Sequence, residues 1–258
     1  MAKRASIQNW AVDKIASSLD PKARVIEVGC GSGFTSTQLK QRGFTVCCAD
    51  VGNWHADRGD LEHTSGADLS GSLPFADAQY DAVVSLEVLE HLTNPFNAVA
   101  ELSRILRCGG ELFLTLPDFW SARSRWRFLW RGSVNRSRVR DEACRRALVS
   151  GACPPHINTM PWTTLKFALV AYGFEVLELE GYRRRLAPHL PYLPLASAIW
   201  LSTRVARRSR RDRYELDESN RWSILLGSQH VYIRARKLRD VNAQRAQRAA
   251  PRSAAAPS

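Results

Sequence analysis

Three glycines at alternate positions, Gly29, Gly31 and Gly33, follow the short apolar run RVIEV. Glycines in this position are typical of a turn whose backbone approaches a ligand closely. The turn is not a dinucleotide fingerprint, because Phe34 stands where the third glycine of a GxGxxG pattern would fall. It is not a P-loop either, since the GK[ST] ending is absent. We therefore expect a ligand that is not held by its phosphates.

The segments that must position this turn alternate between strand-like and helix-like patterns over the first 120 residues. This alternation predicts an α/β sheet with helices on both faces. One helix is expected from the glycine turn to about Lys40, and another from Asn94–Pro95 up to the CGG that should stop it. The expected strands are RVIEV, GFTVCCAD, YDAVVSLEV and ELFLTLP.

The second half continues this pattern around two unusual segments. PWTTLKFALVAYGF predicts a helix capped by Gly173, FEVLELE a strand, and HVYIRARK a closing strand at 230–237. We divide the chain into a core (1–118), an Arg/Trp-rich lid (119–155) and the remainder of the core (156–239) with an insertion at 181–221. The Ala-, Arg- and Pro-rich end, 240–258, is expected to be disordered.

Charge is distributed unevenly along the chain, whose net charge is +12. Residues 1–120 carry 10 Lys and Arg against 15 Asp and Glu, whereas the remaining residues carry 27 against 10. The basic character therefore belongs to the second half, which is expected to contact an anionic partner such as a lipid surface, a substrate phosphate or RNA.

The chain shows no targeting or metal-binding pattern. Its first residues, MAKRASIQNW, lack the apolar region of a secretory signal, and its longest apolar run is shorter than the ~20 residues of a membrane-spanning helix. We expect a cytoplasmic protein, with peripheral association with the inner membrane face left open. No metal site is predicted, because the cysteines lack CxxC spacing. They are expected to be buried, reduced thiols: Cys30, Cys47, Cys48, Cys108, Cys144 and Cys153.

Two long segments resemble a known family. VIEVGCGSG is similar to the first motif of the class I S-adenosylmethionine (SAM)-dependent methyltransferases. LPFADAQYDAVVSLEVLEHLTNPFNAVAELSRILRCGGELFLTLPD resembles their middle section, within the group of menaquinone/ubiquinone-type and glycan-modifying enzymes. The resemblance covers 20–120 closely and 154–181 loosely. It implies a Rossmann-like, mainly parallel sheet with an antiparallel closing strand, a helical lid and a C-terminal insertion.

The resemblance also implies a cofactor, SAM, which has no phosphate. Asp50 would accept hydrogen bonds from the ribose hydroxyls, while Asp68 and Leu69 would contact the adenine. Glu27 would anchor the glycine loop or the amino group of SAM, or merely cap backbone N–H groups. The cofactor-binding residues that we predict are Glu27, Gly29, Cys30, Gly31, Gly33, Asp50, Val51, Asp68, Leu69 and Glu87.

Methyl transfer is an in-line displacement, in which a hydroxyl acceptor benefits from a general base. The candidate bases are His156, His91 and Asp118. His156 is favoured because PPHINTMPWTTLKFALVAYGF resembles a family segment whose histidine faces the acceptor; a structural hydrogen-bonding role is the alternative. LPDFW differs from the NPPY-type motif, which counts against adenine or amide methylation.

The two basic segments limit the chemical class of the methyl acceptor. The lid interleaves Trp with Arg in DFWSARSRWRFLWRG, which suits a sugar beside a phosphate or a membrane surface, or equally an ordinary helical lid with solvated arginines. LPYLPLASAIWLSTRVARRSRRDR joins an apolar stretch to an arginine cluster that could lie on anionic lipid, or could simply pack on the sheet. We expect O-methylation of a small molecule or a lipid-linked glycan or quinone precursor. An RNA methyltransferase and a non-catalytic SAM-binding, partner-binding module are the alternatives.

Overall fold

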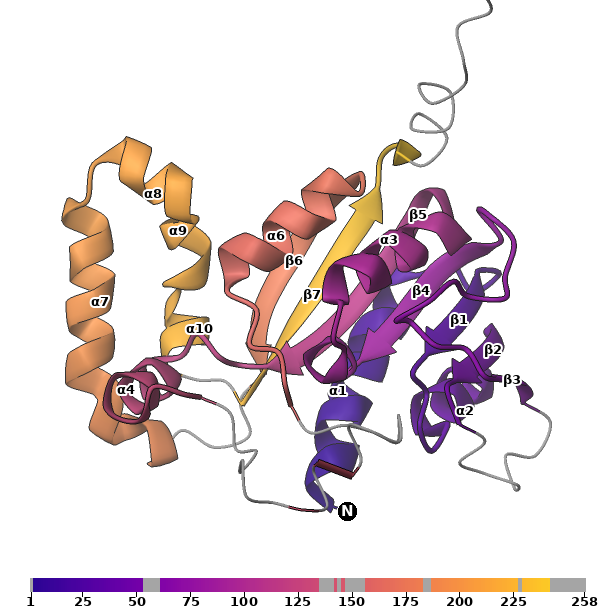
Figure 1. Cartoon of the computed structure of the whole chain (residues 1–258), viewed down its shortest axis with the longest axis horizontal. Coiled ribbons are helices and arrows are strands. Elements are labelled where there is room, and N and C mark those ends of the chain that lie inside the picture. Colours follow the sequence, from indigo (N-terminus) through magenta and orange to yellow (C-terminus); the bar gives the residue numbers. More distant parts are fainter. Residues whose placement is uncertain are drawn as a thin grey trace, which may run out of the picture.

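The computed structural model describes residues 2–52, 61–134, 142, 145–146, 156–182, 187–226 and 229–241 (Figure 1). Seven strands form one sheet in the order β3-β2-β1-β4-β5-β7-β6. All neighbouring strands are parallel except β7, which runs antiparallel to β5 and β6. The predicted Rossmann-like sheet with an antiparallel closing strand is confirmed.

Every strand except β3 contains one of the apolar runs that the sequence pattern indicated. The bounds of the strands are β1 Arg24–Val28, β2 Thr45–Asp50, β3 Glu62–Ser65, β4 Tyr80–Leu86, β5 Leu106–Pro117, β6 Phe174–Tyr182 and β7 His230–Lys237. The central strands are almost entirely buried, which explains why they read as continuous apolar runs.

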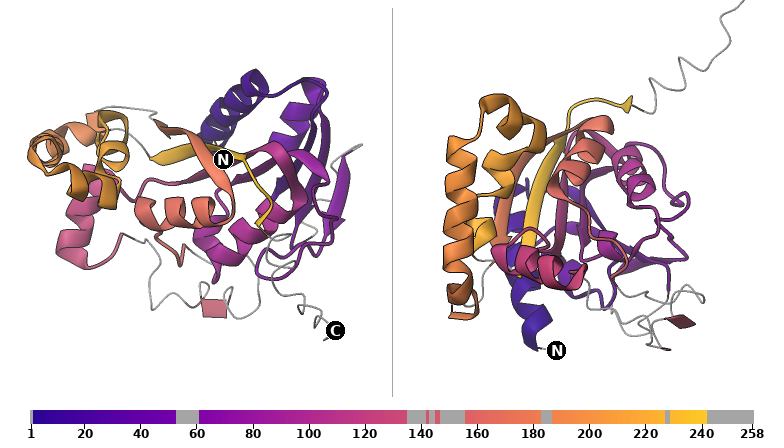
Figure 2. Two further views of the ribbon diagram at one scale, coloured as in Figure 1. Left: turned by 90° about the horizontal axis from the view of Figure 1, so that it is seen from above. Right: turned by 60° about the vertical axis from the view of Figure 1, so that its left-hand side comes forward.

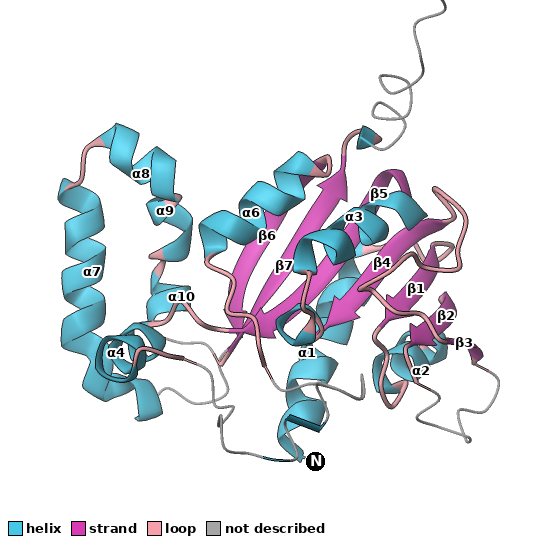
Figure 3. Cartoon of the chain, viewed as in Figure 1, coloured by secondary structure: helices cyan, strands magenta, loops and turns pink. Residues whose placement is uncertain are grey.

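Helices cover both faces of the sheet, as Figure 3 shows. On one face, α1 (Ala2–Ser18) and α2 (Phe34–Gln41) enclose a core that includes Ile15, Leu39 and Phe113. On the other face, α3 (Pro95–Ile105) and α6 (Trp162–Ala171) enclose a larger core. The positions of these helices are explained by the need of each helix to bury its apolar side against the sheet.

Three local features differ from the expectation. The helix α1 and the short strand β3 were not predicted. The helix α3 ends at Ile105, before the CGG that was expected to stop it, and that CGG lies inside β5. Gly109 does adopt φ +78°, but in a strand whose register shifts between Tyr80 and Ala82 of the neighbouring strand. The prediction that CGG caps the helix was therefore wrong.

A group of helices lies beyond the β6 side of the sheet (Figures 1 and 2). We call residues 187–226 the helical insertion; it contains η2 (Ala187–Tyr192), α7 (Leu193–Val205), α8 (Arg208–Tyr214), α9 (Leu216–Ser219) and α10 (Trp222–Leu225). Together with α4 (Ala122–Arg131), it encloses a small core of its own around Ala122, Ala196 and Leu225.

Polar contacts fix the helical insertion to the core. Trp162 Nε1 donates to a carboxylate oxygen of Glu218 at 2.7 Å, and Lys166 bridges Glu215 and Glu218 at 2.8 and 2.9 Å. Arg125 on α4 donates to Asn220 Oδ1 at 2.5 Å. Because these contacts join α4, α6 and the insertion, α4 and the helical insertion are held in one place relative to the sheet.

Several predictions fall outside the described residues. They concern most of the lid after Val134, which includes Cys144 and Cys153, and the tail from 242 onward. Among the cysteines that are described, Cys30, Cys47 and Cys48 are buried and reduced as expected, but Cys108 is exposed, so that part of the expectation was wrong. Within the described residues, no helix combines the length and the apolar character needed to cross a bilayer.

Candidate active site

The site lies where the parallel strands end. The carboxyl ends of β1, β2, β4 and β5 meet at one edge of the sheet, and ligands of open α/β sheets bind outside this edge. The antiparallel β7 begins at the same edge, because His230 pairs with Pro117 at the end of β5. Most of the side chains predicted for the site stand on the turns that follow these strand ends.

The glycine loop is held by the neighbouring strand. The backbone N–H groups of Gly29 and Cys30 both donate to the carbonyl of Ala49, at 2.8 and 3.2 Å, and that of Gly31 donates to Asp50 Oδ2 at 2.8 Å. Gly29 has φ +79°, and a Cβ at this position would stand 2.4 Å from Cγ2 of Val88. Glycine is therefore required here both by conformation and by space.

Glu27 is buried on β1 and points toward the start of α2. Its Oε2 accepts hydrogen bonds from the backbone N–H and the hydroxyl of Ser36, at 2.8 and 2.6 Å. Burial raises the pKa of Glu27 to about 7, although the hydrogen bonds from Ser36 act in the opposite direction. The alternative role, a cap for backbone N–H groups, is thus present in this structure; contact with the amino group of SAM stays a prediction.

The predicted ribose and adenine residues lie at the end of β2 and in the segment that follows β3. Asp50 is buried and also receives the backbone N–H of Gly52 at 3.3 Å. Val51 is exposed. Asp68 is exposed and accepts a hydrogen bond from the backbone of Ser70 at 2.8 Å, while Leu69 is buried. A carboxylate at the end of β2 beside an exposed apolar side chain is suited to a ribose and a purine ring.

Glu87 reveals a partner that sequence reasoning missed. It follows β4 with φ +59°, a strained conformation for a residue other than glycine. One carboxylate oxygen lies 2.8 Å from Nδ1 of His230, and the other has no hydrogen-bond partner among the described residues. Only the pairing of β7 with β5 brings this histidine to the site. Its position as the first residue of the closing strand was the one available signal.

Two of the three candidate bases lie side by side. The rings of His91 and His156 make an edge-to-face contact, with centroids 4.7 Å apart. The Nε2 atom of each is 3.9 Å from Oε1 of Glu90, which is buried. Backbone N–H groups of Ile157 and Asn158 donate to the carbonyl of Glu90, which fixes the segment carrying His156 beside the turn after β4.

This group could act in two ways. The carboxylate can orient a histidine and stabilise its protonated form, as a general base requires. One ligand atom each from Glu90, His91 and His156 lies within 4.8 Å of the others, a spacing that also suits a cation.

Asp118, the third candidate, is used differently. Its Oδ1 accepts hydrogen bonds from the backbone N–H groups of Trp120 and Ser121, at 2.7 and 2.8 Å. It is buried and shapes the turn that leads into α4. The structure therefore gives Asp118 a structural contact, and its role as a base stays a prediction.

A pocket of about 730 Å³ opens beside this turn. Aromatic and apolar side chains dominate its wall, among them Phe119, Trp120, Phe128, Met160 and Trp162. It is bounded by α4, by the segment before α6 and by α8, so that both basic segments of the chain contribute to it.

Comparison with known proteins agrees with this architecture. Residues 8–179, about two thirds of the chain, match the family model described as a methyltransferase domain. The ubiquinone biosynthesis O-methyltransferases of Pseudomonas entomophila and Dechloromonas aromatica are 33% and 32% identical over 115 and 103 residues, which are 42% and 36% of this chain. These matches cover 48% and 43% of the two relatives, so the chain spans less than half of their length.

Solved structures share the fold at low identity. A SAM-dependent methyltransferase from Archaeoglobus fulgidus superposes with a TM-score of 0.58 at 19% identity, covering 91% of this chain and 94% of its own. A geranyl diphosphate C-methyltransferase from Streptomyces coelicolor, in complex with S-adenosyl-L-homocysteine, gives 0.52 at 16% identity, covering 91% and 79%. Family model and sheet order agree: this chain belongs to the methyltransferase-domain family, within the class I SAM-dependent methyltransferase superfamily.

Proposed function

We propose that this protein transfers the methyl group of SAM to an oxygen of an apolar acceptor that carries an anionic group. The observation that carries the proposal is the glycine loop bound to Asp50 at the carboxyl edge of the sheet. The loop offers close backbone approach without a phosphate cradle, and the carboxylate at the end of β2 can accept both ribose hydroxyls. SAM combines a ribose with no phosphate, which fits both features.

The aromatic lining of the 730 Å³ pocket supports an apolar acceptor. Its aromatic wall would contact rings or alkyl chains, and Phe119 and Trp120 place its inner end just after β5. Arg210 belongs to this wall and also to a second pocket of about 360 Å³ that contains Arg213. An acceptor with an apolar body and a phosphate or carboxylate would place the body in the first pocket and the anion in the second.

The histidine pair would supply the general base. When bound, SAM would supply the methyl group, and the imidazole of His156 would accept the proton of the acceptor hydroxyl. Glu90 would stabilise the resulting imidazolium from 3.9 Å. His91 packs against the ring of His156 and would hold its orientation.

A membrane surface is the proposed location of a lipid-linked acceptor. The outer side of α4 exposes Leu129 and Trp130, which are 72% and 69% exposed, and α7 exposes Leu201 and Val205. The guanidinium of Arg204 lies 4.9 Å from the ring of Trp200, and the arginines of α8 follow directly. Exposed apolar side chains beside arginines suit the interface of an anionic bilayer.

Substitution of Asp50 by alanine should weaken SAM binding. Loss of a charged acceptor for two hydroxyls is expected to raise the dissociation constant at least tenfold, or about 1.4 kcal/mol. Isothermal titration calorimetry of the wild type, Asp50→Ala and Asp77→Ala measures the effect. Asp77 is an exposed carboxylate that precedes β4, at the opposite edge, and its variant should bind like the wild type. Equal affinity in all three proteins would remove Asp50 from the site.

Substitution of His156 by alanine should slow methyl transfer without weakening cofactor binding. Removal of a general base typically costs 10²–10⁴-fold in rate. The assay follows tritium from methyl-labelled SAM into the organic-soluble fraction of a bacterial lipid extract. His189→Ala, a buried histidine of the helical insertion, is the control. Transfer to RNA in place of the organic fraction would contradict the proposed acceptor class, and an unchanged rate would contradict the proposed base.

The arginines of the second pocket should determine acceptor affinity. In the same assay, Arg210→Ala/Arg213→Ala should raise the apparent KM for the extract at least tenfold and leave kcat nearly unchanged, because these groups bind the anion away from the methyl. Arg207→Ala/Arg208→Ala removes the same charge from the neighbouring residues, which do not line the pocket. Equal KM values for the two variants would show that only overall charge matters.

The apolar side of α4 should contribute to membrane binding. Binding to phosphatidylglycerol vesicles, measured by co-sedimentation, should be roughly a hundredfold weaker for Leu129→Ala/Trp130→Ala, because ~1.5 kcal/mol or more for each of two large apolar side chains removed from water amounts to about 3 kcal/mol. Phe167→Ala/Val170→Ala truncates exposed apolar side chains on α6 and should bind like the wild type. If the wild type does not sediment with these vesicles, the membrane location is wrong.

A further inference from the structure

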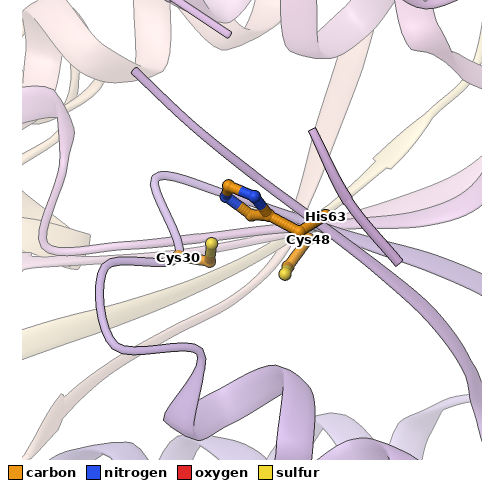
Figure 4. A group of neighbouring side chains, drawn as sticks. All are labelled: Cys30, Cys48 and His63. Atoms are coloured by element: carbon orange, nitrogen blue, oxygen red, sulfur yellow. The ribbon is translucent and has the colours of Figure 1, made fainter. Parts of the chain in front are cut away.

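Two thiols and an imidazole meet behind the glycine loop. Cys30 comes from the loop itself, Cys48 from the middle of β2 and His63 from β3 (Figure 4). The strand register explains the meeting, because Cys48 pairs directly with His63. Cys30 joins them because its loop bends back over β2, where its backbone N–H is bound to the carbonyl of Ala49.

The spacing of the three side chains is close to that of a coordination site. One ligand atom from each residue, two Sγ atoms and one ring nitrogen, lies within 4.8 Å of the others. In a tetrahedral zinc site with Zn–S bonds of ~2.3 Å, two sulfur atoms are ~3.8 Å apart. Small side-chain movements therefore suffice to complete the geometry. Both cysteines are buried, at 4% and 1% exposure, so the two thiol donors are already removed from water, and His63 is half-buried.

The donor set determines which cations would bind. Thiolate sulfur and imidazole nitrogen favour Zn²⁺ and other thiophilic cations over Mg²⁺ and Ca²⁺, which prefer oxygen ligands. Binding releases the two thiol protons, and two thiolates then balance a divalent cation. The neutral result is compatible with a buried position, where an uncompensated charge would be costly.

We propose that Cys30, Cys48 and His63 form a binding site for Zn²⁺ or a cation of similar chemistry, on the inner side of the glycine loop. The site is distinct from the histidine pair at the acceptor side. The fourth coordination position would be taken by water or by a further side chain. Because Cys30 belongs to the loop, the cation would fix the loop at the end of β1.

The test uses the full-length protein, stripped with a chelator and kept reduced with a phosphine. Titration with Co²⁺ should give one bound equivalent with thiolate-to-cobalt charge-transfer absorption and the intense d–d bands of a tetrahedral site, both lost on addition of Zn²⁺. Cys48→Ala and His63→Ala should each bind Co²⁺ at least tenfold more weakly. Cys47→Ala is the matched control, since this buried neighbour lies on the opposite face of β2, in contact with Glu62.

Thermal unfolding is a second measurement, which distinguishes a variant that has lost the metal site from one that folds poorly. Zn²⁺ should raise the midpoint of thermal unfolding of the wild type and of Cys47→Ala, but not that of His63→Ala or Cys48→Ala. The proposal is overturned if the wild type gives no thiolate-to-cobalt absorption. It is overturned equally if the absorption persists in both Cys48→Ala and His63→Ala.

Discussion

The hydrogen bond between the backbone N–H of Gly31 and the carboxylate of Asp50 connects the ends of two adjacent strands. The proposed cofactor site depends on this connection. It holds the loop after β1 in the conformation that Gly29 permits, and it orients the carboxylate toward the same edge. The arrangement exists only because β1 and β2 are parallel neighbours in register, so that Val28 and Ala49 are paired where the two strands end. The pairing of β1 with β2 therefore fixes both the conformation of the loop and the direction of the Asp50 carboxylate.

Charge is distributed unequally between the two halves of the chain. The acidic first half carries the predicted cofactor residues, and SAM would bring a sulfonium cation to it. The basic second half surrounds an aromatic pocket and presents arginines on α8. A cationic methyl donor and an anionic acceptor would thus each meet complementary charge before they meet one another. Burial raises the pKa of Glu27 to about 7, so this carboxyl is less acidic than an exposed one.

The sequence predicted those parts of the fold whose signals are local. Buried strands such as RVIEV and YDAVVSLEV, and the start of α3 at Asn94–Pro95, carry their patterns within a few residues. The strand EHTS at the sheet's outer end is polar and short, so nothing in it indicated pairing. The helix α1 was overlooked, although Ile7, Ala11 and Ile15 follow a helical spacing and are buried.

The site was only partly predictable for the same reason. Glycine loop and strand-end carboxylates are recognisable because their spacing along the chain is fixed by one turn. The contacts of Glu87 with His230, and of Cys48 with His63, arise from strand register between distant segments, which no local pattern encodes. The proximity of His91 to His156 likewise depends on backbone hydrogen bonds from Ile157 and Asn158 to Glu90.

The central claim is that SAM occupies the edge formed by the ends of β1, β2 and β4. Hydrogen–deuterium exchange with and without S-adenosylhomocysteine, the product that retains the adenosine and amino acid parts, tests it most directly. The account predicts slower exchange at the amides of 29–36, 50–52, 66–71 and 87–91, with little change in the helical insertion. Protection confined to the helical insertion, or no protection at saturating ligand, would contradict it.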